Sequence, residues 1–118
     1  LRRAFRDTAE RLLGARRTTG RPVSLLVIDV DHFKLVNDTF GHLQGDAMLR
    51  LVADQVRAHT RPSDLPARYA GDEFVVLLPG TPLAEACAVA ERLRAAVAGA
   101  ACPRRDGSGE AVRATLSI

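Results

Sequence analysis

A chain of 118 residues with 47% hydrophobic content is long enough for one globular domain and leaves little room for a second. Its formal charge of +3 would suit a polyanion, but aromatic residues make up only 4% and the basic residues are scattered, which argues against a nucleic-acid-binding protein. The cysteines, Cys87 and Cys102, form no CxxC pair and have no histidine at ligand spacing. We therefore expect no disulfide and no zinc site, and a reducing, cytoplasmic setting.

The first part of the chain predicts a helix followed by a buried strand. Apolar residues recur at helical spacing from Leu1 to about Ala15, which predicts an amphipathic helix there. The run from Val23 to Val30 is apolar at nearly every position, which is typical of a central strand covered on at least one face. After the turn at His32 a helix is expected, and another from about Gln44 to Ala58.

The second part predicts a hairpin, a helix and a last strand. Two strand-like runs meet at Gly71-Asp72, a two-residue hairpin whose first position is expected to need a positive φ. Thr81 as N-cap and Pro82 at the first helical position predict a helix whose apolar stripe ends near Val97. Residues 101–110 form a Pro/Gly/Arg loop, and 112–118 alternate as a strand.

The order of these elements defines the expected fold class. Helix, strand, two helices, hairpin, helix and strand predict an α/β protein, a two-layer structure with a mixed, mainly antiparallel sheet, because a hairpin pairs its neighbouring strands directly. No internal repeat interrupts this order, so one domain is expected over residues 1–118.

Acidic residues stand at two predicted strand ends. Asp29 and Asp31 close the first strand, and Asp72 and Glu73 follow Gly71 in the hairpin. Hard divalent cations such as Mg²⁺ prefer carboxylate oxygens and complete their shell with phosphates and water. Each acid alone is equally well explained as a turn or cap residue, but together they indicate a metal site.

These segments resemble the GGDEF family of diguanylate cyclases, which condense two GTP molecules into cyclic di-GMP plus pyrophosphate. The signature in this chain is Ala70-Gly71-Asp72-Glu73-Phe74, with alanine in place of the first glycine, and the second segment runs from Asp29 to Asp38. The resemblance covers nearly the whole chain and implies the palm-like, ferredoxin-related fold of nucleotidyl cyclases. Relative to the family pattern, we expect the domain to be truncated at both ends.

The resemblance also implies roles for the acidic residues. Asp29, the backbone carbonyl of Val30, and Asp72 would bind Mg²⁺ or Mn²⁺, two ions per active half-site. Glu73 would be a further catalytic residue, as a metal ligand or proton acceptor, although adjacent strand residues point to opposite faces. Asp31 is expected to be structural.

The substrate residues follow in the same way. The loop at His32, Phe33 and Lys34 would hold the β- and γ-phosphates on free helix amides, and Asn37 and Asp46 would recognise guanine. A side chain at Gly71 would obstruct a phosphate.

A second ligand site is implied further along the chain. Arg61-Pro62-Ser63-Asp64 matches the family's RxxD motif for inhibition by cyclic di-GMP, and Arg92 matches an arginine contributed across a dimer contact. The resemblance thus implies a homodimer for catalysis, GTP as substrate, cyclic di-GMP as product and inhibitor, and a sensor or receiver domain fused in the full-length protein. The composition argues against nucleic acid as a partner. The alternative is a degenerate, non-catalytic domain that binds GTP or cyclic di-GMP as a receptor module.

Overall fold

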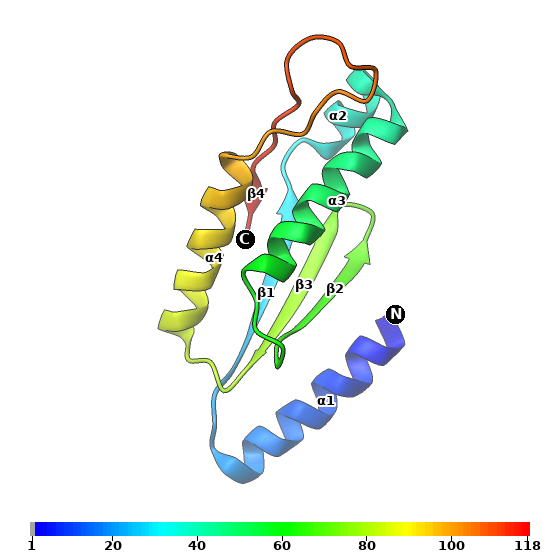
Figure 1. Cartoon of the computed structure of the whole chain (residues 1–118). Helices are drawn as coiled ribbons and strands as arrows, with labels where there is room; N and C mark the ends of the chain where they lie inside the picture. The colour runs from blue at the N-terminus through cyan, green and yellow to red at the C-terminus, as the bar shows by residue number, and fades with distance from the viewer. Residues whose placement is uncertain (1) are drawn as a thin grey trace.

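The computed structural model describes residues 2–118, so the predicted helix start at Leu1 lies outside the described residues. Helices and strands follow the predicted order (Figure 1), with bounds α1 Arg2–Thr19, β1 Val23–Val30, α2 Phe33–Phe40, α3 His42–Ala58, β2 Leu65–Ala70, β3 Glu73–Pro79, α4 Leu83–Ala98 and β4 Leu116–Ser117. Within this part of the chain, no helix is long and apolar enough to cross a membrane.

One four-stranded sheet in the order β2-β3-β1-β4 organises the molecule. Neighbouring strands pair antiparallel throughout, with Val27 opposite Val75 and Asp29 opposite Ser117. From β1 onward the chain follows the βαββαβ order of ferredoxin-like folds, with α2 and α3 together filling the first helical connection. The predicted fold class is therefore confirmed, with a sheet that is antiparallel at every pairing of the described strands.

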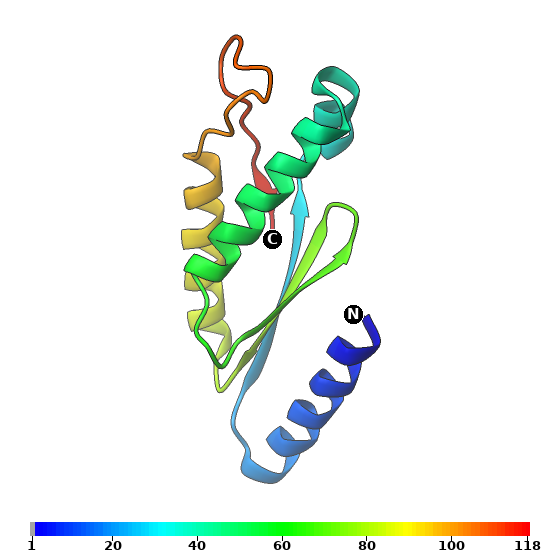
Figure 2. The same ribbon diagram turned by 45° about the vertical axis from the view of Figure 1, so that its right-hand side comes forward.

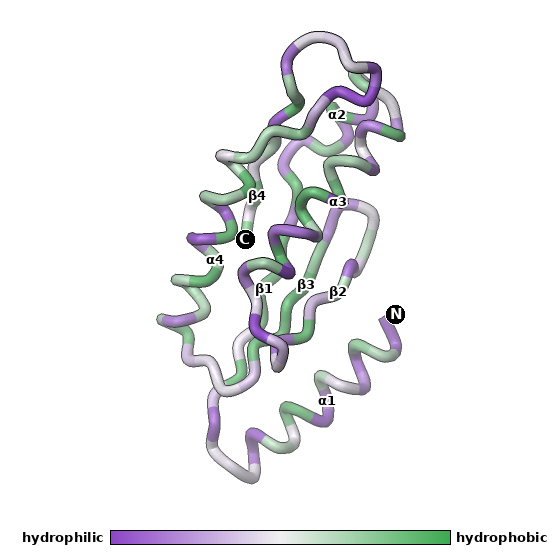
Figure 3. Tube along the Cα trace, in the orientation of Figure 1, coloured by the Kyte–Doolittle hydropathy of each residue, from purple (hydrophilic) through white to green (hydrophobic). Residues whose placement is uncertain are grey.

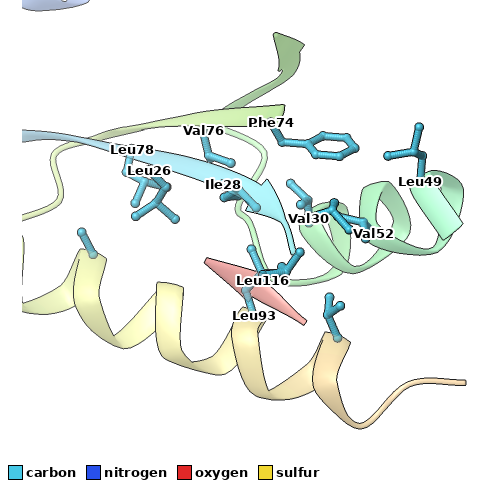
Figure 4. Packing of buried hydrophobic residues seen from close by; sticks show 13 residues of the cluster. Leu26, Ile28, Val30, Leu49, Val52, Phe74, Val76, Leu78, Leu93 and Leu116 are labelled. Carbon is cyan, nitrogen blue, oxygen red and sulfur yellow. The ribbon is translucent and has the colours of Figure 1, made fainter. Parts of the chain in front are cut away.

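The main core lies between one face of the sheet and the helices α3 and α4. Strand residues alternate in direction, so Ile28 and Val76 point into this layer together with their i±2 neighbours. Figure 4 shows these side chains directed at the two helices. The other buried members of the cluster are Leu49, Val52 and Val56 from α3, Ala86, Leu93 and Val97 from α4, and Leu116 from β4. Figure 3 shows hydrophobic colour along much of β1 and β3.

The opposite face of the sheet is covered less completely. Leu25 and Val27 are 52% and 50% exposed there, whereas Val75 and Leu77 are buried. The helix α1 contacts β2 and β1, and Figure 2 shows it apart from the α3 and α4 layer. The prediction that β1 is covered on at least one face is confirmed.

Several element boundaries differ from the sequence prediction, and α1 runs to Thr19 instead of ending near Ala15. The expected strand over 112–118 is only β4, because Val112 exchanges both backbone hydrogen bonds with Cys102 and closes its own loop instead of pairing with β1. Thr81 is not an N-cap: Pro82 holds that position, and the Thr81 hydroxyl donates to the Pro79 carbonyl and accepts from Arg61.

Candidate active site

The two predicted acidic segments meet at one end of the sheet. Asp29 is the penultimate residue of β1 and lies opposite Glu73, the first residue of β3. The backbone amide of Val30 donates to the carbonyl of Asp72 at 3.1 Å, which ties β1 to the hairpin turn. Asp29 is exposed, and Asp72 and Glu73 are half-buried. The fold therefore brings three carboxylates together at the ends of two paired strands.

The crowding of carboxylates changes the electrostatics of Asp29. Partial desolvation raises the pKa of Asp29, and the charge of Asp72, a hydrogen bond to Asp72, and the charges of Glu73 and Asp31 raise it further. A raised pKa means that the ionised carboxylate is disfavoured in the folded protein. A bound cation would relieve this repulsion.

Asp31, unlike Asp29, is held by hydrogen bonds to the C-terminal segment. It accepts hydrogen bonds from the hydroxyls of Thr115, at 2.7 Å, and Ser117, and these bonds lower the pKa of Asp31. Its amide also donates to the Thr115 carbonyl at 2.9 Å. Asp31 thus joins the C-terminal segment to β1, which agrees with the structural role expected for it.

The donor set at this strand end fits magnesium. Among residues 2–118, no group of three or more His, Cys, Asp or Glu side chains is arranged to hold a metal by protein ligands alone. Mg²⁺ normally binds through one or two carboxylates, keeps several waters and takes substrate phosphates as further ligands. The pair of Asp29 and Asp72, with mutual repulsion to relieve, matches that requirement.

The helix α2 begins directly beside the acidic residues. Its N-cap residue, His32, has φ 55° and ψ 32° and makes no side-chain capping bond, so the first amides of the helix keep their hydrogen-bonding capacity. Lys34, exposed in the first turn, pairs with Asp38 through Nζ and Oδ2 at 2.8 Å. The predicted phosphate loop is therefore a helix start with available donors, next to the carboxylates.

Asn37 and Asp46 are linked through Gly45. The side-chain oxygen Oδ1 of Asn37 is buried and has no hydrogen-bond partner within the described chain. A Cβ on Gly45 would lie 1.8 Å from this oxygen and 3.2 Å from the ring of Phe33. The glycine therefore lets α2 and α3 approach closely, which places Asn37 against the turn of α3 that carries Asp46.

A cavity of about 540 Å³ opens beside Asp46. It lies between α3 and the β2–β3 hairpin and is lined by Leu49 and Phe74 together with Arg50 and Arg68. Asn37 does not line this cavity; its buried oxygen lies on the α2 side of Gly45. The apolar walls with a few charged groups have the general composition of a small-molecule pocket.

The hairpin differs in detail from the prediction. Gly71 is not among the glycines with positive φ in the described chain, and a Cβ there would meet no protein atom within 4 Å. The expectation of a positive φ is wrong. The pairing shifts register between Arg68 and Ala70, and such a bulge supplies the twist that a mirror-image turn would otherwise provide.

Arg68, which the sequence analysis did not single out, holds this turn. Its Nε and Nη2 donate to the Gly71 carbonyl at 3.0 and 2.7 Å. The sequence signal for this contact is that Arg68 precedes Gly71 by three residues across the predicted turn. The guanidinium fixes the backbone just before Asp72.

Arg61, Asp64 and Arg92 line a second cavity of about 240 Å³. Asp64 has only 3% of its side chain exposed and accepts from the Arg61 amide at 2.8 Å. Nη2 of Arg61 lies 2.6 Å from the Thr81 hydroxyl and 3.3 Å from Oδ1 of Asp64. This cavity is at the Pro79 end of β3, a strand length of roughly 20 Å from Asp72.

Comparison with known proteins decides the family. The family model described as "Diguanylate cyclase, GGDEF domain" matches residues 2–118. The chain belongs to the GGDEF family. Over 102 residues it is 46% identical to the diguanylate cyclase DgcP of Pseudomonas aeruginosa, and over 99 residues it is 48% identical to the response regulator PleD of Caulobacter vibrioides. The GGDEF domain of DgcB from Caulobacter crescentus, solved in complex with c-di-GMP, superimposes with a TM-score of 0.93 at 33% identity.

The GGDEF chain matches only part of these relatives. The alignments cover 86% of it and 15% of DgcP, and 84% of it and 22% of PleD. The structural match covers 98% of it and 68% of the DgcB chain. The predicted family and fold are confirmed, with Ala70 as a departure from the signature for which the family is named.

Proposed function

We propose that this GGDEF domain is a diguanylate cyclase that condenses two GTP molecules into cyclic di-GMP and pyrophosphate. The observation that carries the proposal is the meeting of Asp29 and Asp72 at paired strand ends, held by the bond from the Val30 amide to the Asp72 carbonyl. In each condensation the 3′-oxygen of one GTP forms a bond to the α-phosphorus of the other, and the bond to pyrophosphate breaks. Two such steps close the ring and release two pyrophosphates.

In this proposal the acidic residues hold the metal. Asp29, Asp72 and the Val30 carbonyl would bind two Mg²⁺ or Mn²⁺ ions per half-site, and Glu73 would act as a further metal ligand or as the acceptor of the proton from the attacking hydroxyl. A two-ion site supplies charge stabilisation at the attacking and leaving oxygens of an in-line displacement. Desolvation raises the pKa of Asp29, and the charges of Asp72, Glu73 and Asp31 raise it further; a cation would offset those charges, which supports this assignment.

The residues around α2 and α3 bind the nucleotide. The amides at His32, Phe33 and Lys34 take the β- and γ-phosphates, since a helix start offers free N–H donors and favours negative charge. Gly71 leaves room for a phosphate, as its surroundings are open. Both features lie beside the acidic residues.

Guanine is recognised by Asn37 and Asp46. An amide can pair with O6 of guanine and a carboxylate can accept from N1 and the exocyclic N2, whereas adenine presents the reverse pattern. In this pairing Nδ2 of Asn37 would donate to O6, and the cavity beside Asp46 supports the assignment.

Catalysis is proposed to need a homodimer, because each subunit presents one GTP to the other. Cyclic di-GMP is proposed to inhibit at Arg61, Asp64 and Arg92, which line one cavity remote from the acidic residues. The arginine forks suit paired hydrogen bonds to a guanine edge or a phosphate.

The same proposal includes a sensor or receiver domain in the full-length protein, which the greater length of the relatives supports. It also includes a cytoplasmic location, which the two free cysteines support.

The alternative is a receptor domain that binds GTP or cyclic di-GMP without turnover, which Ala70 favours. Incubation with GTP and Mg²⁺, followed by chromatography of the nucleotides, separates the two. Cyclic di-GMP with pyrophosphate supports the cyclase. Binding of either nucleotide by a folded protein that yields no product would establish the receptor.

A further inference from the structure

A buried glutamine joins the first turn of α3 to a loop far along the chain. Gln44 is 3% exposed, and both ends of its amide are used. Its Nε2 donates to the Pro103 carbonyl at 3.0 Å and lies 3.3 Å from Sγ of Cys102, and its Oε1 accepts from the Arg105 amide at 2.9 Å. The side chain thus satisfies backbone groups from both sides of the 103–105 turn.

The loop that Gln44 holds is also closed on itself. Cys102 and Val112 exchange backbone hydrogen bonds of 2.9 and 2.8 Å. Their side chains form a small second hydrophobic cluster with Val36 of α2 and Met48 of α3. The loop is therefore a packed support beneath both helices, and Gln44 is its polar connection to α3.

Helix geometry makes this connection relevant to the nucleotide. Successive residues of a helix point about 100° apart, so the sequence Gln44-Gly45-Asp46 faces three directions. Gln44 meets the loop, Gly45 allows the close approach of Asn37, and Asp46 faces the cavity against the hairpin. Because the three residues share one helical turn, holding Gln44 against the loop also fixes the directions in which Gly45 and Asp46 face.

We propose that Gln44 is a positioning residue for base recognition, which locks the 103–105 backbone to the first turn of α3 and so sets the placement of Asn37 and Asp46. The inference rests on the proposed guanine-binding role of that pair. Without the amide, the Pro103 carbonyl and the Arg105 N–H lose their partner, and a buried unsatisfied group drives local rearrangement. The turn of α3 then loses its fixed rotation.

The test compares Gln44→Leu with Gln55→Leu, the same substitution on the same helix at a half-buried position. Dissociation constants for GTP and ATP are measured by titration, with ATP determined by competition where it binds weakly. We expect Gln44→Leu to weaken GTP about tenfold, the scale of one unsatisfied buried group, and ATP less than about twofold. Gln55→Leu should leave the ratio unchanged. Amide hydrogen exchange at Arg105 should speed up only in Gln44→Leu.

The outcomes separate the inference from the function on which it rests. A wild-type protein that binds GTP no better than ATP contradicts the guanine assignment and this inference together. A wild-type preference that survives intact in Gln44→Leu, or equal losses for both nucleotides, overturns the positioning role alone. If Gln44→Leu does not fold, Gln44→Glu, which keeps an acceptor for the Arg105 amide, is subjected to the same comparison.

Discussion

The Val30 amide donates to the Asp72 carbonyl at 3.1 Å, and through this bond the end of β1 and the turn of the hairpin become one structural unit. Asp29 and Asp72 come from segments about forty residues apart, yet their carboxylates are close enough to perturb each other. The bond uses backbone atoms only, so side-chain substitutions at either acid leave it in place.

This arrangement predicts that Asp29→Asn abolishes product formation without destabilising the fold. Desolvation and the neighbouring carboxylates raise the pKa of Asp29, so a neutral isostere removes an unfavourable charge from an exposed position. We expect the thermal midpoint of unfolding in metal-free buffer to be unchanged or higher. We also expect weaker binding of Mn²⁺, which is measured by the paramagnetic effect of the ion on water relaxation. A clear fall in the midpoint would show that Asp29 has a packing role instead.

The guanine assignment predicts a loss of base selectivity. Asn37→Ala or Asp46→Ala should weaken GTP much more than ATP, by about 1 to 3 kcal/mol for each partner left unsatisfied. The matched control for Asp46→Ala is Asp54→Ala, which changes an exposed aspartate on the same helix, α3. Parallel losses for both nucleotides in a titration would mean that neither residue recognises the base.

Gly45, at the contact between α2 and α3, and Gly14, on the open side of α1, should respond in opposite ways to substitution by alanine. Gly45→Ala places a Cβ 1.8 Å from Oδ1 of Asn37, and the forced shift should destabilise the fold by about 1 to 3 kcal/mol in denaturant unfolding. Gly14→Ala, inside α1 with no atom within 4 Å of the new Cβ, should stabilise by about 0.5 to 1 kcal/mol. If Gly45→Ala is neutral, Asn37 is free to move and the close approach is not required.

The cavity at Arg61 predicts separable feedback and stability effects. Arg92 is exposed and makes no ion pair within residues 2–118, so Arg92→Ala should raise the inhibition constant for cyclic di-GMP and leave the thermal midpoint and the basal rate unchanged. Arg61→Ala should relieve inhibition and also loosen the loop, because it loses the bonds to Thr81 and Asp64. Inhibition curves and thermal melts measure the two effects. An unchanged inhibition constant in both variants would remove this cavity from product sensing.

Local patterns predicted much of this structure. The apolar run Val23–Val30 is a strand with the predicted bounds. A run that is apolar at nearly every position is typical of a central strand. The acidic strand ends meet because β3, which starts at Glu73 after the hairpin turn, pairs antiparallel with β1, which ends just after Asp29. The resemblance of the signature supplied the family, which periodicity alone would not.

Other features depend on contacts that no local pattern records. Gly71 has no positive φ in a hairpin whose pairing shifts register between Arg68 and Ala70. Thr81 does not cap α4, because its hydroxyl bonds to Arg61 and to the Pro79 carbonyl. Gln44 shows the limit most clearly, since its partners Pro103 and Arg105 lie 59 and 61 residues away. Tertiary hydrogen bonds of that range have no sequence signature.

The most direct test of the account is the nucleotide product formed from GTP and Mg²⁺ by the wild-type protein and by Asp72→Ala, with circular dichroism on both. The half-buried turn acid contributes little to the core, so both proteins should give the same folded spectrum. The account predicts cyclic di-GMP and pyrophosphate from the wild type and none from Asp72→Ala, because the variant lacks a carboxylate of the proposed metal site. Appreciable cyclic di-GMP from folded Asp72→Ala, or none from a folded wild type that binds GTP, would contradict it.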